Sequence, residues 1–145
     1  MTVSVADTSF LFSLYGNDAH TAKARGWVRQ SRMPVTVSVL GRYEFQNAIR
    51  FAAFRKVIFP ADALASLTAF ESDLRDGHLE LAACDLASVV ADATRLSERH
   101  TLTGGHRSFD VLHVAAARLL KATTLLSFDA NQRELAAVVR LNVGP

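Results

Sequence analysis

The stretch VSVADTS, residues 3–9, starts as a short apolar run and ends in a single acid, Asp7, followed by two hydroxyl residues. The apolar part is typical of a buried strand, and Asp7 or Thr8 is well placed to cap a helix that ends near Gly16. A strand followed at once by a helix is the opening unit of an α/β fold. An acid at such a junction serves as a helix cap, a metal ligand or a phosphoryl acceptor, and the residues downstream must distinguish these roles.

Strand and helix patterns alternate along the rest of the chain. Further strands are expected at residues 35–37, 79–83, 123–129 and 139–142. Helices are expected at residues 18–31, 40–57, 62–76, 85–99, 108–122 and 130–138, with a polar loop at 100–107. No repeat or linker interrupts the pattern. We therefore predict a single domain over residues 1–145, a three-layer α/β/α sandwich around a parallel sheet of four to five strands.

Composition narrows the class of protein without deciding its function. Half of the 145 residues are apolar, but no apolar run approaches the roughly 18 residues of a membrane span, and no basic region opens a secretory signal. A cytoplasmic protein without a membrane segment is expected. Cys84 is the only cysteine, which excludes an intramolecular disulfide and a cysteine-based zinc site.

Four acids follow strands or open helices on one side of the predicted sheet. Asp7 and Asp129 end strands, Glu44 lies early in the helix after the second strand, and Asp110 opens a helix after a Gly-Gly loop. Ligands of parallel sheets bind beyond the carboxyl ends of the strands, where these acids are expected to meet. Carboxylates at about 4 Å repel each other by roughly 1 to 4 kcal/mol per pair, so a cation should compensate them. An all-oxygen ligand set suits Mg²⁺ or Mn²⁺.

The motifs ADTS, YEFQNAI, SFDVLHVAAA and LLSFDANQ occur in this order over nearly the whole chain. In this arrangement the chain resembles the PIN-domain family, and within it the small VapC-type toxin ribonucleases. The resemblance implies a PIN-like fold and an endoribonuclease that hydrolyses RNA and uses one or two Mg²⁺ or Mn²⁺ ions. It further implies that the four acids are catalytic residues and metal ligands, and that Thr8 and Ser9 orient ligands or phosphate. The family often has an acid after the final Phe-Asp, where this chain has Ala130 and Asn131.

The resemblance also implies partners. A VapC-type toxin belongs to a type II toxin–antitoxin pair and is neutralised by a cognate antitoxin. The aromatic helix after Asp7, with Phe10, Phe12, Leu14 and Tyr15, is expected to border an apolar groove for an antitoxin segment that presents a basic residue to the acids. The alternative is that these side chains are ordinary core.

Rival functions lack their defining residues. A receiver domain needs two adjacent acids after its first strand and a lysine near the last, and an aspartyl phosphatase needs Asp-x-Asp where this chain has Asp7, Thr8 and Ser9. A nuclease for structured DNA is expected to carry clamp segments for which the chain has no room. The remaining alternative is a non-toxin PIN fold that processes RNA or serves as an RNA-binding or assembly module, but loss of acids would mark the latter.

A basic stripe is the second feature that favours RNA. Arg25, Arg29 and Arg32 recur at helical spacing and are candidates for contact with an RNA backbone, although a solvated helix face explains them equally well. Without the four candidate ligands the chain has 16 basic and 10 acidic side chains, a surplus that favours phosphate binding.

Two further predictions concern packing. The helix at 40–57 carries one apolar face with Phe45 and Ile49 and another with Tyr43, Phe51 and Phe54, which predicts a homodimer interface. The histidines receive different predictions. His113 is expected to be packed or to contact a ligand rather than bind metal itself, whereas His100 and His106 are expected to be solvated.

Overall fold

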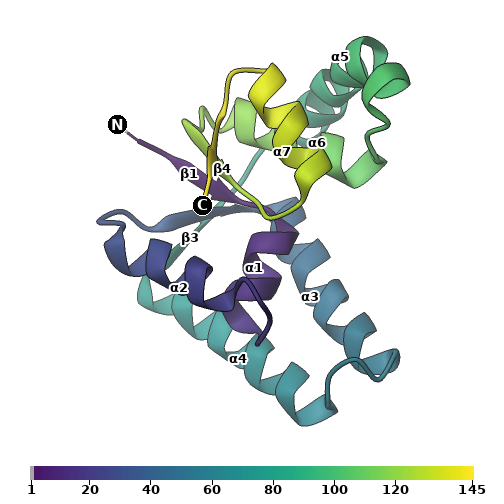
Figure 1. Cartoon of the computed structure of the whole chain (residues 1–145). Helices are drawn as coiled ribbons and strands as arrows, with labels where there is room; N and C mark the ends of the chain where they lie inside the picture. Colours follow the sequence, from purple (N-terminus) through teal and green to yellow (C-terminus); the bar gives the residue numbers. More distant parts are fainter. Residues whose placement is uncertain (1) are drawn as a thin grey trace.

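A five-stranded parallel sheet forms the centre of the protein (Figure 1). The structure is a computed structural model that describes residues 2–145. The strand order is β3-β2-β1-β4-β5. The strands are β1 Ser4–Ala6, β2 Val35–Ser38, β3 Leu79–Ala82, β4 Thr124–Leu126 and β5 Asn142–Gly144. The order places β1 between β2 and β4, so the ends of these three strands are neighbours. The parallel α/β sheet predicted from the sequence is confirmed.

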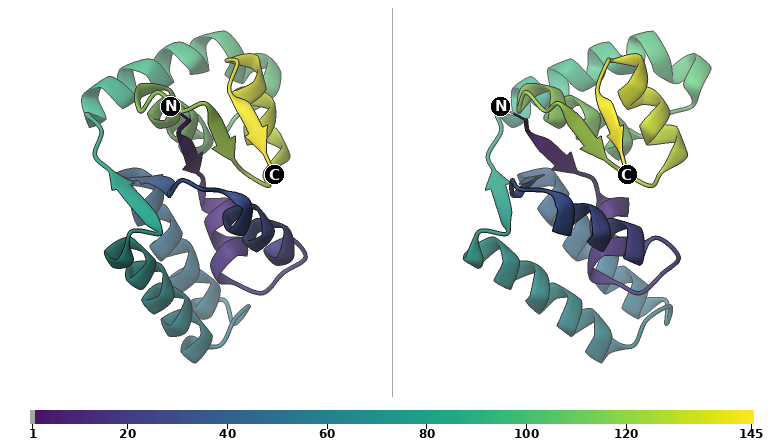
Figure 2. Two further views of the ribbon diagram at one scale, coloured as in Figure 1. Left: turned by 90° about the vertical axis from the view of Figure 1, so that its left-hand side faces the viewer. Right: turned by 60° about the vertical axis from the view of Figure 1, so that its left-hand side comes forward.

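Helices cover both faces of this sheet (Figure 2). They are α1 Thr8–Tyr15, α2 Thr21–Gln30, α3 Val39–Phe54, α4 Pro60–Asp76, α5 Leu86–Gly104, α6 Ser108–Leu119 and α7 Ala130–Val138. One apolar core lies between the sheet and α5, α6 and α7, and the other between the sheet and α1 to α4. The three-layer sandwich is thus as predicted.

Helix caps stand directly at the ends of the central strands. The Phe10 amide donates to Asp7 Oδ1 at 2.8 Å and so starts α1, and the Gln132 amide donates to Asp129 Oδ1 at 2.8 Å and starts α7. The hydroxyl of Ser38 caps α3 in the same way. At each of these caps the backbone turns from a strand into a helix. The capping acids Asp7 and Asp129 are therefore fixed at the carboxyl edge of the sheet.

Several predicted boundaries were wrong. The strand predicted at 123–129 ends at Leu126, so Asp129 lies beyond it, and the helices predicted at 40–57 and 108–122 end at Phe54 and Leu119. Helix α5 continues through most of the predicted loop at 100–107 and ends at Gly104. The next residue, Gly105, has a φ of +67°, the left-handed conformation that glycine tolerates. Helix α2 begins at Thr21 rather than at residue 18. The last strand lies at Asn142–Gly144 rather than 139–142, because Val139 and Arg140 still close the final turn of α7.

Within residues 2–145, none of the helices combines the length and the apolar character needed to cross a membrane.

Candidate active site

The four predicted acids all lie at the carboxyl edge of the sheet. Asp7 follows β1 and Asp129 lies just beyond β4, each as the N-cap of the next helix. Glu44 lies in the second turn of α3, and Asp110 in the first turn of α6. Contacts through neighbouring residues link these positions.

Asp7 is the most buried of the four acids, with 1% of its surface exposed. Its Oδ1 accepts hydrogen bonds from the Phe10 amide at 2.8 Å and from the Ser9 hydroxyl at 2.7 Å, whereas its buried Oδ2 has no partner. Burial raises the pKa of Asp7, against the opposite effect of the nearby Ser127 and Ser9 hydroxyls and the Phe10 amide. A buried carboxylate with one free oxygen is well suited to bind a cation.

Asp110 and Asp129 share one cation, Arg107. Arg107 Nε lies 3.2 Å from Asp110 Oδ2, and its Nη2 lies 3.4 Å from Asp129 Oδ2. Burial raises the pKa of Asp110; Arg107 opposes this change and the charge of Asp129 adds to it. The Arg107 side chain itself is 77% exposed. Sequence reasoning missed this residue, although an arginine three positions before Asp110, at a helix start, was a visible signal.

Glu44 is held by a histidine. His113 Nε2 lies 3.1 Å from Glu44 Oε1 and 3.5 Å from the Thr8 hydroxyl. Burial alone would raise the pKa of Glu44, but the hydrogen bonds from His113 and Thr8 outweigh it and the pKa is lowered. His113 is almost fully buried, so its predicted role as a packed residue beside a candidate ligand is confirmed.

The hydroxyl residues after Asp7 connect β1 to β4. The Ser9 hydroxyl donates to Asp7 and accepts from the Phe128 amide at 2.9 Å, and it lies 3.3 Å from the Ser127 hydroxyl. Ser127, which sequence reasoning missed, in turn accepts from the Asp129 amide at 3.1 Å. Ser9 and Ser127 thus fix the ends of both strands relative to each other. The position of Ser9 agrees with its expected orienting role.

The expectation that all four carboxylates gather at one point needs a correction. Among residues 2–145, no three His, Cys, Asp or Glu side chains approach each other closely enough to form a metal site. Instead, Arg107 compensates Asp110 and Asp129, and His113 lies against Glu44. The donors still fit a hard divalent ion, because they are all oxygen atoms and the buried Oδ2 of Asp7 has no hydrogen-bond partner.

A cavity of about 410 Å³ adjoins the acids. It is lined by Thr8, Ser9, Phe12, Ser13, Asp18, His20, Phe128 and Asp129. A second cavity, of about 610 Å³, lies between the end of α1 and the α3–α4 junction and shares Phe12 and Asp18 with the first. We call it the apolar groove, and Tyr15, Ile58 and Phe59 line it as well.

The groove predicted beside α1 is therefore partly confirmed. Phe12 and Tyr15 line it as expected, whereas Phe10 is fully buried in the core. Leu14 lies against a separate, smaller cavity. Phe12, Leu14 and Tyr15 are half-buried and also pack against the core, so the alternative that they are core residues holds in part.

The prediction for His106 was wrong. Its side chain is buried, and its Nδ1 lies 2.7 Å from Asn131 Oδ1. Asn131 also donates to the Gly104 carbonyl at 3.0 Å. Asn131, which follows the final Phe-Asp where the PIN family often has an acid, therefore joins α7 to the α5–α6 turn.

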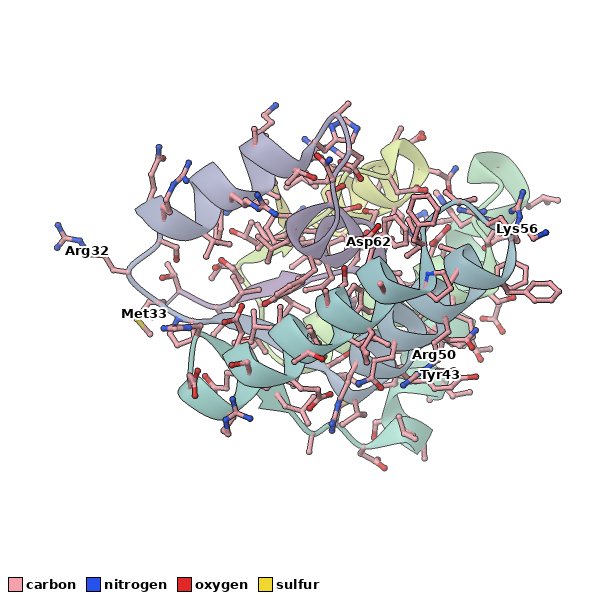
Figure 3. All side chains as sticks on the ribbon, turned by 90° about the horizontal axis from the view of Figure 1, so that it is seen from below. Arg32, Met33, Tyr43, Arg50, Lys56 and Asp62 are labelled. Carbon is pink, nitrogen blue, oxygen red and sulfur yellow. The ribbon has the colours of Figure 1, made fainter. Side chains whose placement is uncertain are left out.

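The arginine stripe is shorter than predicted. Arg25 donates to the Leu14 and Gly16 carbonyls, both at 3.4 Å, and Arg29 lies in the last turn of α2. Arg32 lies beyond the end of α2 and points away from the body of the protein (Figure 3). In residues 2–145, none of the contacts of these arginines involves one of the four acids. The cation that pairs with acids at the site is instead Arg107, which contacts Asp110 and Asp129.

Comparison with known proteins gives a family and a fold. The sequence profile of the PIN domain family matches residues 4–138. Three solved structures are similar over nearly the whole chain. VapC20 of Mycobacterium tuberculosis, described as a sarcin-ricin loop cleaving toxin, has 19% identity and a TM-score of 0.71, with 98% of this chain and 99% of that chain covered.

Two more of the similar structures have lower sequence identity. PAE2754 of Pyrobaculum aerophilum has 17% identity and a TM-score of 0.66, with 99% of this chain and 83% of that chain covered. FitAcB of Neisseria gonorrhoeae has 13% identity and a TM-score of 0.67, with 99% and 97% covered. A comparison with curated proteins finds no match. At these identities the structures establish a shared fold.

Proposed function

Because the chain belongs to the PIN domain family, we propose that it is a divalent-metal-dependent endoribonuclease and the toxin of a type II toxin–antitoxin pair. The single observation that carries the nuclease proposal is the buried Asp7 just after β1, whose Oδ2 has no hydrogen-bond partner. The likeness to VapC20, a toxin that cleaves RNA at the sarcin-ricin loop, supports the toxin part.

In this proposal Asp7, Glu44, Asp110 and Asp129 hold one or two Mg²⁺ or Mn²⁺ ions, partly through water. A bound ion lowers the pKa of a coordinated water and neutralises charge on the phosphate during in-line attack. Ser9 keeps Oδ1 of Asp7 engaged, so that Oδ2 would be the oxygen left to bind the ion. His113 keeps Glu44 ionised and oriented. Thr8, which contacts His113, is assigned to orienting Glu44 or the phosphate.

Arg107 has a separate task. Its exposed guanidinium compensates Asp110 and Asp129 in the free protein. When RNA and a divalent ion are bound, the same guanidinium is free to contact a phosphate, since arginine pairs well with both carboxylate and phosphate oxygens. Arg25, Arg29 and Arg32 are proposed to contact the RNA backbone farther from the cut.

The antitoxin is proposed to occupy the apolar groove. The groove meets the cavity at the acids through Phe12 and Asp18, so an amphipathic segment lying in it reaches Asp129 with its end. The pairing of Arg107 with Asp110 and Asp129 supports an arginine or lysine at that end, because these acids already bind a guanidinium. Such a toxin acts in the cytoplasm, where we expect this protein.

A homodimer through α3 completes the proposal. Tyr43, Phe51 and Phe54 are 62%, 53% and 79% exposed, while Phe45 and Ile49 on the opposite face are buried. Figure 3 shows Tyr43 and Arg50 along the outer side of this helix. Large exposed aromatic side chains on one face are typical of an interface.

The nuclease proposal is tested by mapping cleavage of total RNA with Mn²⁺, with the intact protein and its Asp7→Asn variant side by side. New 5′ ends are expected only with the intact protein and only with metal. Equal cleavage by both proteins would contradict the site.

The toxin proposal needs an experiment in cells. The chain is expressed in growing bacteria with and without the neighbouring open reading frame, and as the Asp7→Asn variant. Growth arrest by the intact chain, relieved by the neighbour or by the substitution, is expected. A chain that cleaves RNA but does not arrest growth would instead be the alternative, a PIN-fold RNA-processing protein.

A further inference from the structure

Three aromatic rings form a stack that runs from the core to the cavity at the acids. Phe128 is stacked on the fully buried Phe10, with centroids 5.8 Å apart and planes at 18°. It is also stacked on His20, at 4.5 Å and 10°. His20 is exposed and lines the 410 Å³ cavity together with Phe128. An exposed imidazole held parallel to a core ring offers a flat surface on which another planar ring can stack.

A carboxylate lies in the same cavity and is fixed there by its neighbours. Asp18 Oδ2 accepts from the Ser13 hydroxyl at 2.9 Å. Asp18 Oδ1 accepts from the His20 amide at 2.8 Å and from the Thr21 hydroxyl at 3.3 Å. A carboxylate offers about four acceptor sites, so about one remains free, on Oδ2. The cavity therefore presents a ring surface and one oriented hydrogen-bond acceptor.

The cavity is continuous with the candidate active site. Thr8, Ser9 and Asp129 line it and also belong to the network around Asp7 and Asp129. Any group bound there lies beside the phosphate that the acids would cleave. In a single-stranded RNA, the group nearest to that phosphate and able to stack is the base of an adjoining nucleotide.

We propose that this cavity binds one unpaired nucleobase next to the scissile phosphate, stacked on His20, and that Asp18 selects bases with an exocyclic amino group. The proposal rests on the nuclease function and adds its sequence preference. Adenine, cytosine and guanine each carry an amino group that can donate to Asp18 Oδ2. Uracil carries none, and the carbonyl oxygens beside its ring N–H would face the carboxylate, so uracil is rejected.

The first experiment measures binding without catalysis. Single-stranded RNA hexamers that differ in one base are titrated into the full-length protein in EDTA, and affinity is followed by fluorescence anisotropy. Hexamers with adenine, cytosine or guanine at one position are expected to bind several times more tightly than the uracil hexamer. His20→Ala should weaken binding by roughly 5- to 150-fold, the range of one base–aromatic stack, while His20→Phe should retain it.

The variants separate stacking from selection. Asp18→Asn replaces one acceptor oxygen by an amide donor, so it should reduce the discrimination against uracil while affecting overall affinity less than His20→Ala does. His78→Ala removes an exposed histidine just beyond the C-terminal end of α4, outside the lining of this cavity, and should bind like the intact protein. Thermal unfolding of each variant checks that the fold is intact. Equal affinity for all four hexamers, or unchanged affinity in His20→Ala, would overturn the proposal.

The second experiment separates this inference from the nuclease proposal. A random single-stranded RNA pool is incubated with Mn²⁺ and the cut positions are sequenced. Depletion of uracil at one position beside the cut, lost in Asp18→Asn, supports both. Cleavage with no base preference overturns the base site alone. No cleavage, together with selective binding in EDTA, overturns the nuclease proposal alone.

Discussion

The Ser9 hydroxyl donates to Asp7 Oδ1 at 2.7 Å, and this contact holds the carboxylate so that its other oxygen has no protein partner. The side chain is almost completely buried, and no protein group donates a hydrogen bond to Oδ2. A buried acceptor without a partner costs stability, and a bound cation removes that cost. Of the four acids, Asp7, directly after the first strand, is therefore the one that a bound cation would stabilise most.

Asp7→Asn should stabilise the metal-free protein increasingly as the pH rises. Burial raises the pKa of Asp7, so the folded protein favours the protonated form and loses stability when the pH rises above the ordinary value of 3.8. Asparagine is neutral throughout. In EDTA, the difference in free energy of unfolding between the variant and the intact protein should therefore grow from about pH 4 to about pH 7, measured by urea denaturation.

Asp62→Asn is the matched control for this measurement, because it makes the same chemical change at an exposed carboxylate, in the first turn of α4. The difference in free energy of unfolding between Asp62→Asn and the intact protein should not grow from about pH 4 to about pH 7. A constant difference for Asp7→Asn across the pH range, or a variant less stable at neutral pH, would contradict the buried-carboxylate argument. With Mn²⁺ present, Asp7→Asn should cleave RNA at least about 100-fold more slowly than the intact protein does.

Divalent metal should raise the melting temperature of the intact protein. An ion that binds the folded acids and not the unfolded chain stabilises by about 2.7 kcal/mol at a free concentration of about 100 times Kd. Differential scanning fluorimetry with Mn²⁺ or Mg²⁺ measures the shift, and EDTA should reverse it. Asp110→Asn should remove most of the shift. If neither a thermal shift nor binding heat is found, the acids are not an ion site.

Arg107→Gln should bind Mn²⁺ more tightly than the intact protein. The guanidinium pairs with Asp110 and Asp129 and so competes with the ion, but it is largely exposed, which keeps the expected gain to about fivefold or less. Calorimetric titration measures the affinity. The control is Arg99→Gln, an exposed arginine of α5 with the same change in charge. A weaker affinity in Arg107→Gln would mean that the guanidinium positions the acids rather than competing with metal.

Charge reversal on α2 should weaken RNA binding without changing sequence preference. Arg25→Glu and Arg29→Glu each replace a cation that is proposed to neutralise a phosphate, so affinity should fall and its dependence on salt should become shallower. Filter binding at several salt concentrations measures both. Arg75→Glu, an exposed change near the end of α4, serves as the control. Affinities equal to that control would assign the arginines to a solvated helix face.

Phe54→Glu should dissociate the proposed homodimer. Phe54 is 79% exposed on α3, and a buried charge at an interface is costly. Light scattering after size exclusion measures the mass of the protein. Leu102→Glu makes a similar change on α5, where Leu102 is 97% exposed, and should leave the mass unchanged. A monomeric intact protein would remove α3 as an interface.

The sequence predicted those features that depend on neighbouring residues. β-branched runs and helix periodicity indicate the strands and helices, and Asp7, directly after the first strand, caps the helix that follows, as expected. Asp129 also caps a helix, which the sequence reasoning did not predict. Because parallel strands end at the same edge, the order of the elements also predicts that these acids lie near each other. The family resemblance rests on the same local motifs.

Only the tertiary structure decided which residues from distant parts of the chain lie beside the acids. His113 and Thr8 are 105 positions apart, and Ser9 and Ser127 are 118 apart, so no local spacing relates them. The same holds for the buried His106, whose partner Asn131 lies on another helix, and for the stack of Phe128 on His20. Local sequence determines the elements and their caps through backbone geometry. Partners, burial and pKa changes depend on how the layers pack, because they arise from atoms that the fold brings together from distant parts of the chain.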